Sequence, residues 1–389
     1  MAGFKAAGIS CGIKKTGRKD LAIILSDSPA SVAGVFTTNR VKAAPVLIDM
    51  ELVRSGKSSG VLVNSGNANA CTGRKGYKDA LQSVRATEDC LGLPKGCLLV
   101  ASTGVIGVPM PIEKVCAGLP RLVEGLRPGG LHDASEAIMT TDAFAKRAFG
   151  RAKIAGKTIT IAGIAKGAGM ICPNMATMLA FFMTDANIKP VTLKKALLSA
   201  VDSSFNSIIV DNDTSTNDTA LIFANGAAKG AEIKAASRDF KAFAALLTEV
   251  SLELSHKIVK DGEGATRFIE IDVRGASTPV EARQAARTIA SSFLVKTAFF
   301  GGDPNWGRIM AALGYSGVRM DEKSVSIFFN NVCVARRGLD TGAEVLAAKA
   351  IKSKTVNVRV ELKAGGHDAK VWTTDLSYDY VKINSAYRT

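Results

Sequence analysis

The chain has 389 residues and a formal net charge of +15, from 50 Lys and Arg against 35 Asp and Glu. Hydrophobic residues make up 47% and charged residues 22%, the composition of an ordinary globular protein with a sizeable core. No window reaches the roughly 18 uninterrupted apolar residues of a membrane span, and the N-terminus lacks the apolar segment of a secretory signal. We therefore expect a cytoplasmic protein that does not enter the membrane.

Strand-like segments alternate with helical ones along the whole chain. Several strands are continuously apolar, which is typical of strands covered on both faces. A helix of about 20 residues is predicted from Ser237, a suitable N-cap, because apolar residues recur at spacings of three and four up to Ile258. This mixture predicts layered sheets flanked by helices. The predicted strands are residues 21–27, 60–66, 97–103, 158–165, 178–186, 219–226, 267–273, 324–331 and 355–362.

Residue types that mark metal, nucleotide and nucleic-acid sites occur without the necessary spacing. The seven cysteines form no C-x-x-C pair, and the three histidines have no metal-like spacing, so we expect no metal site. Gly156-Lys157-Thr158 resembles the end of a P-loop, but Arg151 stands where that motif requires glycine. Basic residues are dispersed, so a solvated surface explains the charge best, followed by acidic small-molecule substrates, with nucleic acid third.

The stretch KGAGMICPNMATMLAFFMTDA, residues 166–186, places Thr177 directly before a predicted buried strand. A threonine hydroxyl is a poor nucleophile unless a base removes its proton, and the α-amine of the same threonine is one such base. Residue 177 is internal, so this hypothesis requires that the bond between Ala176 and Thr177 be cut. On physical grounds alone, a threonine at the start of an apolar strand is more often an ordinary β-branched strand residue than a nucleophile. Cys172 is a rival nucleophile, but no basic neighbour in sequence activates it.

A second motif, LLVASTGVIG, places Thr103-Gly104 after a predicted strand. A hydroxyl and a backbone N–H side by side at such a junction suit the stabilisation of an oxyanion. An ordinary β-turn explains this motif equally well.

Taken together, the motifs resemble the ornithine acetyltransferase (glutamate N-acetyltransferase) family of arginine biosynthesis, the ArgJ family. The resemblance covers essentially the full chain. It is carried, in order, by GFKAAGISCGIKK, VFTTNRVKAAPV, VNSGNANACTG, STGVIG, MTTD, KGAGMICPNMATMLAFFMTDA, DNDTSTND, DGEGAT, FFGGDPNWGRI and INSAYRT.

The resemblance implies self-cleavage into an α chain of residues 1–176 and a β chain of residues 177–389, interlocked in one α/β unit. Thr177 would be the nucleophile at the start of a central strand, with Thr103 and Gly104 as the oxyanion hole. The implied fold is the layered αββα sandwich shared with self-processing aminopeptidases. The substrate-binding positions implied are Thr140 or Thr141, Lys166, Thr177, Glu263, Asn384 and Thr389.

The implied reaction moves the acetyl group of N-acetylornithine to glutamate through an acetyl-Thr177 intermediate. No metal or tightly bound cofactor is expected, and the sequence leaves open whether acetyl-CoA is a second donor. The expected partners are the two small-molecule substrates and further αβ units in a homo-oligomer. Two alternatives stay open: a self-processed threonine amidase or aminopeptidase, and an uncleaved basic binding protein.

Overall fold

The structure, a computed structural model, describes residues 1–172 and 178–386. The chain divides into two compact units. The first unit comprises Met1–Asn206 and Asp213–Ile258, and the second comprises Ser207–Asn212 and the chain from Val259 to the last described residue, Ala386. Each unit has its own sheet and its own hydrophobic core.

The described residues of the first unit form an eight-stranded sheet. Its order is β4, β3, β2, β9, β7, β6, β5, with β1 paired to β2. The pairs β3–β4 and β7–β9 are parallel and the remaining pairs antiparallel. The bounds are β1 Phe4–Ile9, β2 Leu21–Phe36, β3 Lys57–Asn67, β4 Leu98–Val105, β5 Lys146–Ile154, β6 Lys157–Lys166, β7 Leu179–Thr184 and β9 Thr219–Ala224.

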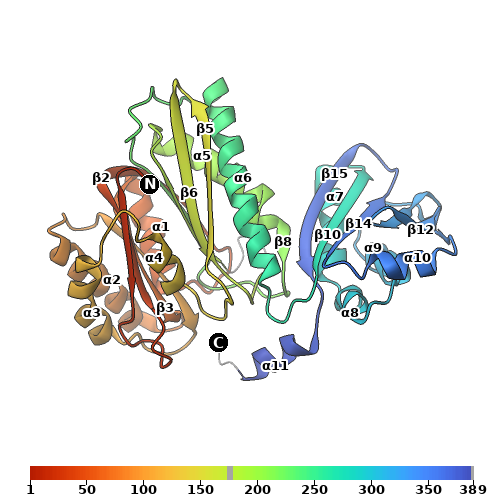
Figure 1. Cartoon of the computed structure of the whole chain (residues 1–389), viewed down its shortest axis with the longest axis horizontal. Helices are drawn as coiled ribbons and strands as arrows, with labels where there is room; N and C mark the ends of the chain where they lie inside the picture. Colours follow the sequence, from red (N-terminus) through yellow and green to blue (C-terminus); the bar gives the residue numbers. More distant parts are fainter. Residues whose placement is uncertain (173–177, 387–389) are drawn as a thin grey trace. The chain divides into compact units, whose positions relative to one another are not determined.

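The sheet of the first unit curves into two layers with helices outside them. Figure 1 shows β2 and β3 in one layer, next to α2 and α3, and β5 and β6 in another, next to α6. One core cluster contains side chains from both layers, including Val63 of β3 and Ile164 of β6, so the layers share an apolar interior. The helices are α1 Ala44–Leu52, α2 Gly73–Leu91, α3 Ile112–Glu124, α4 Leu131–Ala137, α5 Pro190–Ser203 and α6 Arg238–Lys260.

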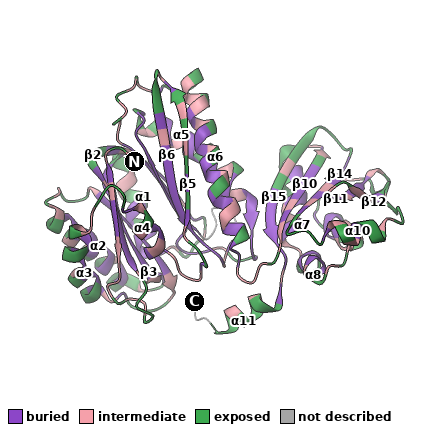
Figure 2. Ribbon diagram, in the orientation of Figure 1, coloured by how far each residue is buried: buried purple, intermediate pink, exposed green. Residues whose placement is uncertain are grey.

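Burial follows this αββα arrangement. Figure 2 shows buried strands inside and exposed residues on the outward faces of the helices. All six residues of β7 are buried, which explains its continuous apolar sequence, whereas β5 alternates buried and exposed residues at the edge of the sheet. α6 packs on this layer, since Leu254 lies beside Gly163 of β6.

The second unit has a seven-stranded sheet within its described residues, in the order β13, β12, β11, β14, β10, β15, β8. α7 packs on β10 and β15, and its apolar face joins the core of this unit. The strands are β8 Ile208–Ile209, β10 Phe268–Ala276, β11 Ser326–Phe329, β12 Val332–Arg336, β13 Leu339–Asp340, β14 Thr355–Glu361 and β15 His367–Thr374. The helices are α7 Pro279–Ser291, α8 Phe293–Gly301, α9 Trp306–Gly314, α10 Glu344–Ala350 and α11 Tyr378–Ala386.

The predicted layered α/β fold is confirmed, and each of the nine predicted strands overlaps an observed one. The predicted N-cap is also confirmed, because the backbone N–H of Phe240 donates to the hydroxyl of Ser237 at 3.0 Å. In the described part of the chain, no helix combines the length and the apolar character that crossing a membrane requires.

Candidate active site

Two predicted site residues, Thr103 and Lys166, lie against each other in the first unit. The ammonium of Lys166, the last residue of β6, donates to the hydroxyl of Thr103 on β4 at 3.4 Å. Thr103 is 9% exposed and Lys166 4% exposed, so this cation lies in the protein interior. A buried cation beside a hydroxyl suits the binding of a carboxylate or of a developing negative charge.

Strand register places the start of β7 at the same end of the sheet. Lys166 of β6 pairs with Leu179 of β7, and Leu179 pairs with Thr219 of β9. The end of β6 and the starts of β7 and β9 therefore lie side by side at one end of the sheet. This arrangement brings together segments that the sequence separates by about 50 positions.

Gly104 permits a close approach of β4 to β3 next to Thr103. Its φ is +135°, and a Cβ added there would lie 2.4 Å from the carbonyl carbon of Gly66. The register between the two strands shifts at this point, at Gly66 and Asn67. Glycine is thus required by both backbone conformation and space.

Asp142 is a residue of this site that the sequence analysis did not single out. Its carboxylate accepts from the ammonium of Lys146 at 2.6 Å and from the backbone N–H groups of Thr140 and Gly167 at 2.9 and 2.7 Å. Burial alone would raise the pKa of Asp142, but the charges of Lys166 and Lys146 hold it below its usual range. Asp142 thereby ties the Thr140 loop to the end of β6. The only sequence signal is its position closing the motif MTTD.

A cavity of about 390 Å³ lies beside Thr140 and is lined by Lys14, Arg18, Lys19 and Asp142, among others. Lys14 Nζ donates to the backbone carbonyl of Met139 at 2.6 Å, next to Thr140. Burial lowers the pKa of Lys14 to about 8; the charges of Lys166 and Arg18 act in the same direction, and Asp20 opposes them. Three cations, Lys14, Arg18 and Lys19, and two carboxylates, Asp142 and Glu136, line the cavity, and Lys19 pairs with Glu136 at 2.8 Å. Thr141 is half-buried and does not line this cavity.

Asp218 is a second site residue that the sequence analysis missed. Its carboxylate accepts from the backbone N–H of Met178 at 3.0 Å, and it is 1% exposed. Burial raises the pKa of Asp218 well above its ordinary value, although the Met178 amide, the charge of Lys166 and the hydroxyl of Ser215 act the other way. Asp218 closes the motif DNDTSTND, which is the only signal in the sequence.

Glu263 and Asn384, two further predicted residues, contact each other in the second unit. The side-chain amide of Asn384 on α11 donates to the Glu263 carboxylate at 2.8 Å. Gly264 allows this contact, because its φ is +69° and a Cβ there would lie 2.4 Å from the backbone nitrogen of Tyr380. Glu263 as a whole is half-buried, and its carboxylate can accept from an ammonium.

Three predicted residues lie outside the described residues: Ala176, Thr177 and Thr389. Thr177 immediately precedes Met178, whose contact with Asp218 is described.

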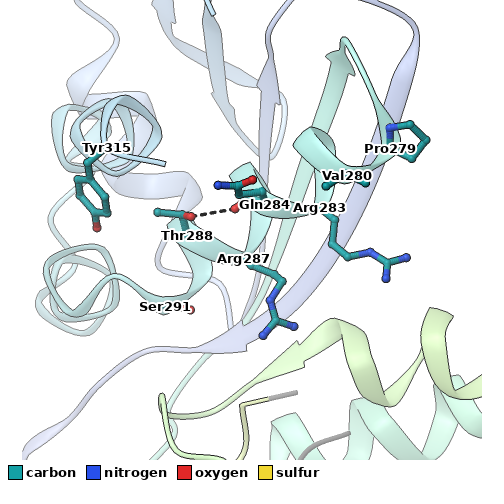
Figure 3. Close-up of a pocket in the computed structure, with 8 residues that line it drawn as sticks. All are labelled: Pro279, Val280, Arg283, Gln284, Arg287, Thr288, Ser291 and Tyr315. Atoms are coloured by element: carbon teal, nitrogen blue, oxygen red, sulfur yellow. Dashed lines mark hydrogen bonds between the residues drawn. The ribbon is translucent and has the colours of Figure 1, made fainter. Parts of the chain in front are cut away.

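A cavity of about 740 Å³ is lined by residues of the second unit and by none of the predicted site residues. Arg283 and Arg287 project from α7, and Tyr315 lies near the end of α9 (Figure 3). Thr288 donates to the backbone carbonyl of Gln284 at 2.8 Å within the helix. Thr103 and Gly104, the predicted oxyanion hole, lie in the first unit, so this cavity is not the predicted active site.

The whole sequence was also compared with models of known protein families. A family model described as the ArgJ family matches residues 5–389. The chain belongs to the ArgJ family. This confirms the resemblance that the motifs carry.

Individual family members match over their full lengths. The arginine biosynthesis bifunctional protein ArgJ of Geobacter sulfurreducens is 51% identical over 389 residues, covering 100% of this chain and 99% of that protein. The protein of the same name from Symbiobacterium thermophilum is 48% identical over 391 residues, covering 100% and 97%. The crystal structure of ArgJ from Bacillus halodurans matches with a TM-score of 0.52 and 39% identity, covering 53% of this chain and 98% of that chain.

Proposed function

We propose that this chain is a self-cleaving glutamate N-acetyltransferase, an acyltransferase of arginine biosynthesis. It moves the acetyl group of N-acetylornithine to glutamate, giving ornithine and N-acetylglutamate. Membership of the ArgJ family, with relatives near 50% identity named for arginine biosynthesis, supports this function. The observation that carries the chemistry is the buried contact between Lys166 and Thr103.

The reaction proceeds in two acyl transfers. The Thr177 hydroxyl attacks the acetyl carbon of N-acetylornithine while its α-amine takes the hydroxyl proton. The oxyanion accepts hydrogen bonds from the Thr103 hydroxyl and the Gly104 N–H, and ornithine leaves carrying the proton. The amine of glutamate then attacks the acetyl ester, and Thr177 regains its hydroxyl proton.

Charged groups recognise the two substrates. Lys166 binds the α-carboxylate, and Glu263, held by Asn384, binds the side-chain ammonium of ornithine. The cavity beside Thr140 is lined by three cations and two carboxylates, and this small excess of positive charge favours acidic substrates. No cofactor takes part in this scheme, since the acetyl group is transferred directly.

Thr177 acquires its free amine by cleavage of the chain. Its hydroxyl attacks the carbonyl carbon of Ala176, the peptide bond breaks to give an ester, and water hydrolyses the ester to leave a carboxylate at residue 176. β7 and β9 would then belong to the β chain, between β2 and β6 of the α chain, so that backbone hydrogen bonds keep the two chains together. The solved Bacillus halodurans chain spans about half of this one, which supports processing.

The amidase alternative is not favoured, because the family to which the chain belongs acts in arginine biosynthesis. Water would have to replace glutamate as the acceptor. The binding-protein alternative is disfavoured for the same reason. We place the enzyme in the cytoplasm as an oligomer of αβ units.

Intact mass measures the cleavage directly. Purified wild-type protein gives two chains that separate on denaturation, the second beginning at Thr177, whereas the Thr177→Ala variant stays as one chain of 40.7 kDa and transfers no acetyl group. An uncut variant that retained full acetyl transfer would refute the mechanism. Supplying acetyl-CoA as sole donor to the wild-type enzyme tests the second donor separately.

A further inference from the structure

Glu263 lies in a tight turn of the second unit, between α6 and β10. The N–H of Ala265 donates to the carbonyl of Gly262 at 2.9 Å, which closes the turn around Glu263 and Gly264. The φ of Gly264 is +69°, a conformation that glycine favours inside such a turn. Because the turn is short, the direction of the Glu263 side chain depends on the contacts that hold the turn in place.

Asp375, the first residue after β15, holds the chain that follows this turn. Its Oδ1 accepts from the backbone N–H groups of Thr266 and Arg267 at 2.8 and 2.9 Å. Its Oδ2 accepts from the Thr266 hydroxyl and lies 3.7 Å from a guanidinium nitrogen of Arg267. Asp375 is 2% exposed, so water screens these contacts little. One carboxylate thus fixes the two residues that connect the turn to β10.

Ser377, two residues further on, holds the turn itself. Its hydroxyl donates to the backbone carbonyl of Gly264 at 2.6 Å, and the residue is 5% exposed. A Cβ added at Gly264 would lie 2.7 Å from this hydroxyl oxygen, so the two segments are in direct contact. Asp375 and Ser377 therefore hold the Glu263 turn at its end and at its centre.

The segment that contains Asp375 and Ser377 is itself anchored by Lys296 of α8. Lys296 Nζ donates to the hydroxyls of Thr373 and Thr374 at 2.9 and 3.0 Å. The backbone N–H of Leu376 donates to the carbonyl of Lys296 at 3.3 Å. Since Lys296 is 1% exposed, this anchor lies in the interior of the second unit. The position of the segment is therefore fixed before any substrate binds.

The same segment leads directly into α11, which carries the second residue of the predicted ammonium site. α11 begins at Tyr378, whose ring packs edge-on against that of Phe300 with centroids 5.4 Å apart. From α11, the side-chain amide of Asn384 reaches the Glu263 carboxylate at 2.8 Å. Both Glu263 and Asn384 are thus placed by the residues that follow β15.

We propose that Asp375 is the positioning residue of Glu263 and, with Ser377, sets the selectivity of the enzyme for a substrate that carries a side-chain ammonium. This rests on the proposed function, in which Glu263 binds the ammonium of ornithine. A carboxylate on a loosely held turn loses conformational freedom when it binds a cation, and one already held in place loses less. Asp375 acts through Glu263 and does not touch substrate.

The second unit provides a matched control for each residue. Asp272 on β10 is also 2% exposed, and its Oδ2 accepts from the guanidinium of Arg274 at 2.7 and 2.9 Å. Ser316 is also 5% exposed, and its hydroxyl donates to the backbone carbonyl of Leu313 at 2.6 Å. The described hydrogen bonds join neither control residue to residues 262–267.

The test measures kcat/KM of the cut enzyme for each substrate in turn, because an acyl-enzyme separates the reaction into two half-reactions. Asp375→Asn keeps an oxygen for the two backbone N–H groups but removes the charge that faces Arg267, so kcat/KM for N-acetylornithine falls about tenfold. Ser377→Ala removes one neutral hydrogen bond and lowers it about fivefold. In both variants kcat/KM for glutamate changes less than about twofold, as do both constants in Asp272→Asn and Ser316→Ala. Equal losses for the two substrates, or none for N-acetylornithine, overturn the proposal.

A double-mutant cycle distinguishes positioning from a general structural effect. In the Glu263→Gln background the partner of the ammonium is already lost, so adding Ser377→Ala changes kcat/KM for N-acetylornithine less than about twofold. The same fivefold loss in both backgrounds overturns the proposal. A wild-type enzyme that transfers no acetyl group overturns the proposed function, and wild-type kinetics in Glu263→Gln overturn the role of Glu263. An effect of Glu263→Gln without one of Asp375→Asn or Ser377→Ala overturns only the positioning role.

Discussion

Lys166 and Thr103 are in hydrogen-bond contact across 3.4 Å although 63 positions separate them in sequence. Lys166 is the last residue of β6, and Thr103 lies two residues before the end of β4. Both side chains are buried, so the ammonium is held where water screens its charge little. A substrate carboxylate or an oxyanion next to Thr103 would gain more from this cation than from one at the surface.

Replacing Lys166 by Met tests the role of this cation. The substitution keeps most of the side-chain volume but removes the charge-assisted hydrogen bond, so KM for N-acetylornithine and glutamate rises about 10- to 100-fold. Steady-state kinetics with each substrate varied in turn measures the change. Lys157→Met, at the exposed opposite end of β6, is the control and changes KM less than about twofold. Unchanged KM values in Lys166→Met would contradict carboxylate binding.

Thr103 is expected to act on the rate rather than on binding. Thr103→Ala removes a hydroxyl donor from the oxyanion, which lowers kcat about 10²-fold or more with little change in KM. Thr103→Ser retains the hydroxyl and keeps kcat within about tenfold of wild type. Rapid-quench measurement of acetyl-enzyme formation distinguishes the effect on chemistry from one on product release. Equal kcat in the Ala and Ser variants would exclude the oxyanion role.

The sequence predicts continuously buried strands better than partly exposed ones. β7 is continuously apolar because both of its faces are buried, and its pattern identifies it. β5 alternates Arg147, Phe149 and Arg151, all exposed, with more buried residues at the edge of the sheet, so its composition does not distinguish it from a loop. A continuously apolar sequence indicates a strand buried on both faces. β5 is paired to β6 by backbone hydrogen bonds, and these do not depend on the composition of the strand.

The site was predictable only in part, for a related reason. Family resemblance identifies Thr103 and Lys166, but no local pattern reveals that two strand ends meet. Asp142 and Asp218 were missed because an aspartate in a polar loop motif usually forms a turn. Their burial against backbone N–H groups depends on long-range packing, which distinguishes them from turn residues.

Gly104 is predicted to tolerate no side chain. Gly104→Ala places a Cβ 2.4 Å from the backbone of Gly66 at a φ of +135°, so the strands must separate and the free energy of unfolding falls by about 3 kcal/mol or more. Gly107→Ala is the control, with a φ of +78° and open space around the added Cβ. It costs about 1 kcal/mol, from backbone strain alone. Urea unfolding of both variants measures the difference, and equal losses would show that the close approach is unimportant.

Glu263 is predicted to select for the ammonium of ornithine. Glu263→Gln keeps an acceptor for the Asn384 amide but removes the negative charge, so KM for N-acetylornithine rises about tenfold or more while KM for glutamate changes less. Glu322→Gln, at an exposed position of the same unit, serves as the control. Equal increases in KM for both substrates would argue for a general structural effect rather than recognition of the ammonium.

Because of Lys296, the free energy of unfolding of the second unit is predicted to be larger at alkaline pH than at neutral pH. Its buried ammonium donates to the hydroxyls of Thr373 and Thr374 at 2.9 and 3.0 Å, and burial lowers its pKa to about 7, opposed by Asp375 and Asp211.

The sign of the effect follows from proton binding. Because the ordinary lysine pKa is about 10.4, the unfolded chain binds more protons than the folded one between about pH 7 and 10.4, so the free energy of unfolding rises with pH. The contribution of Lys296 is at most about 1.4 kcal/mol per pH unit. Urea unfolding at several pH values should show a smaller rise for Lys296→Met than for wild type. Parallel curves for the two proteins would mean that Lys296 keeps an ordinary pKa in the folded state.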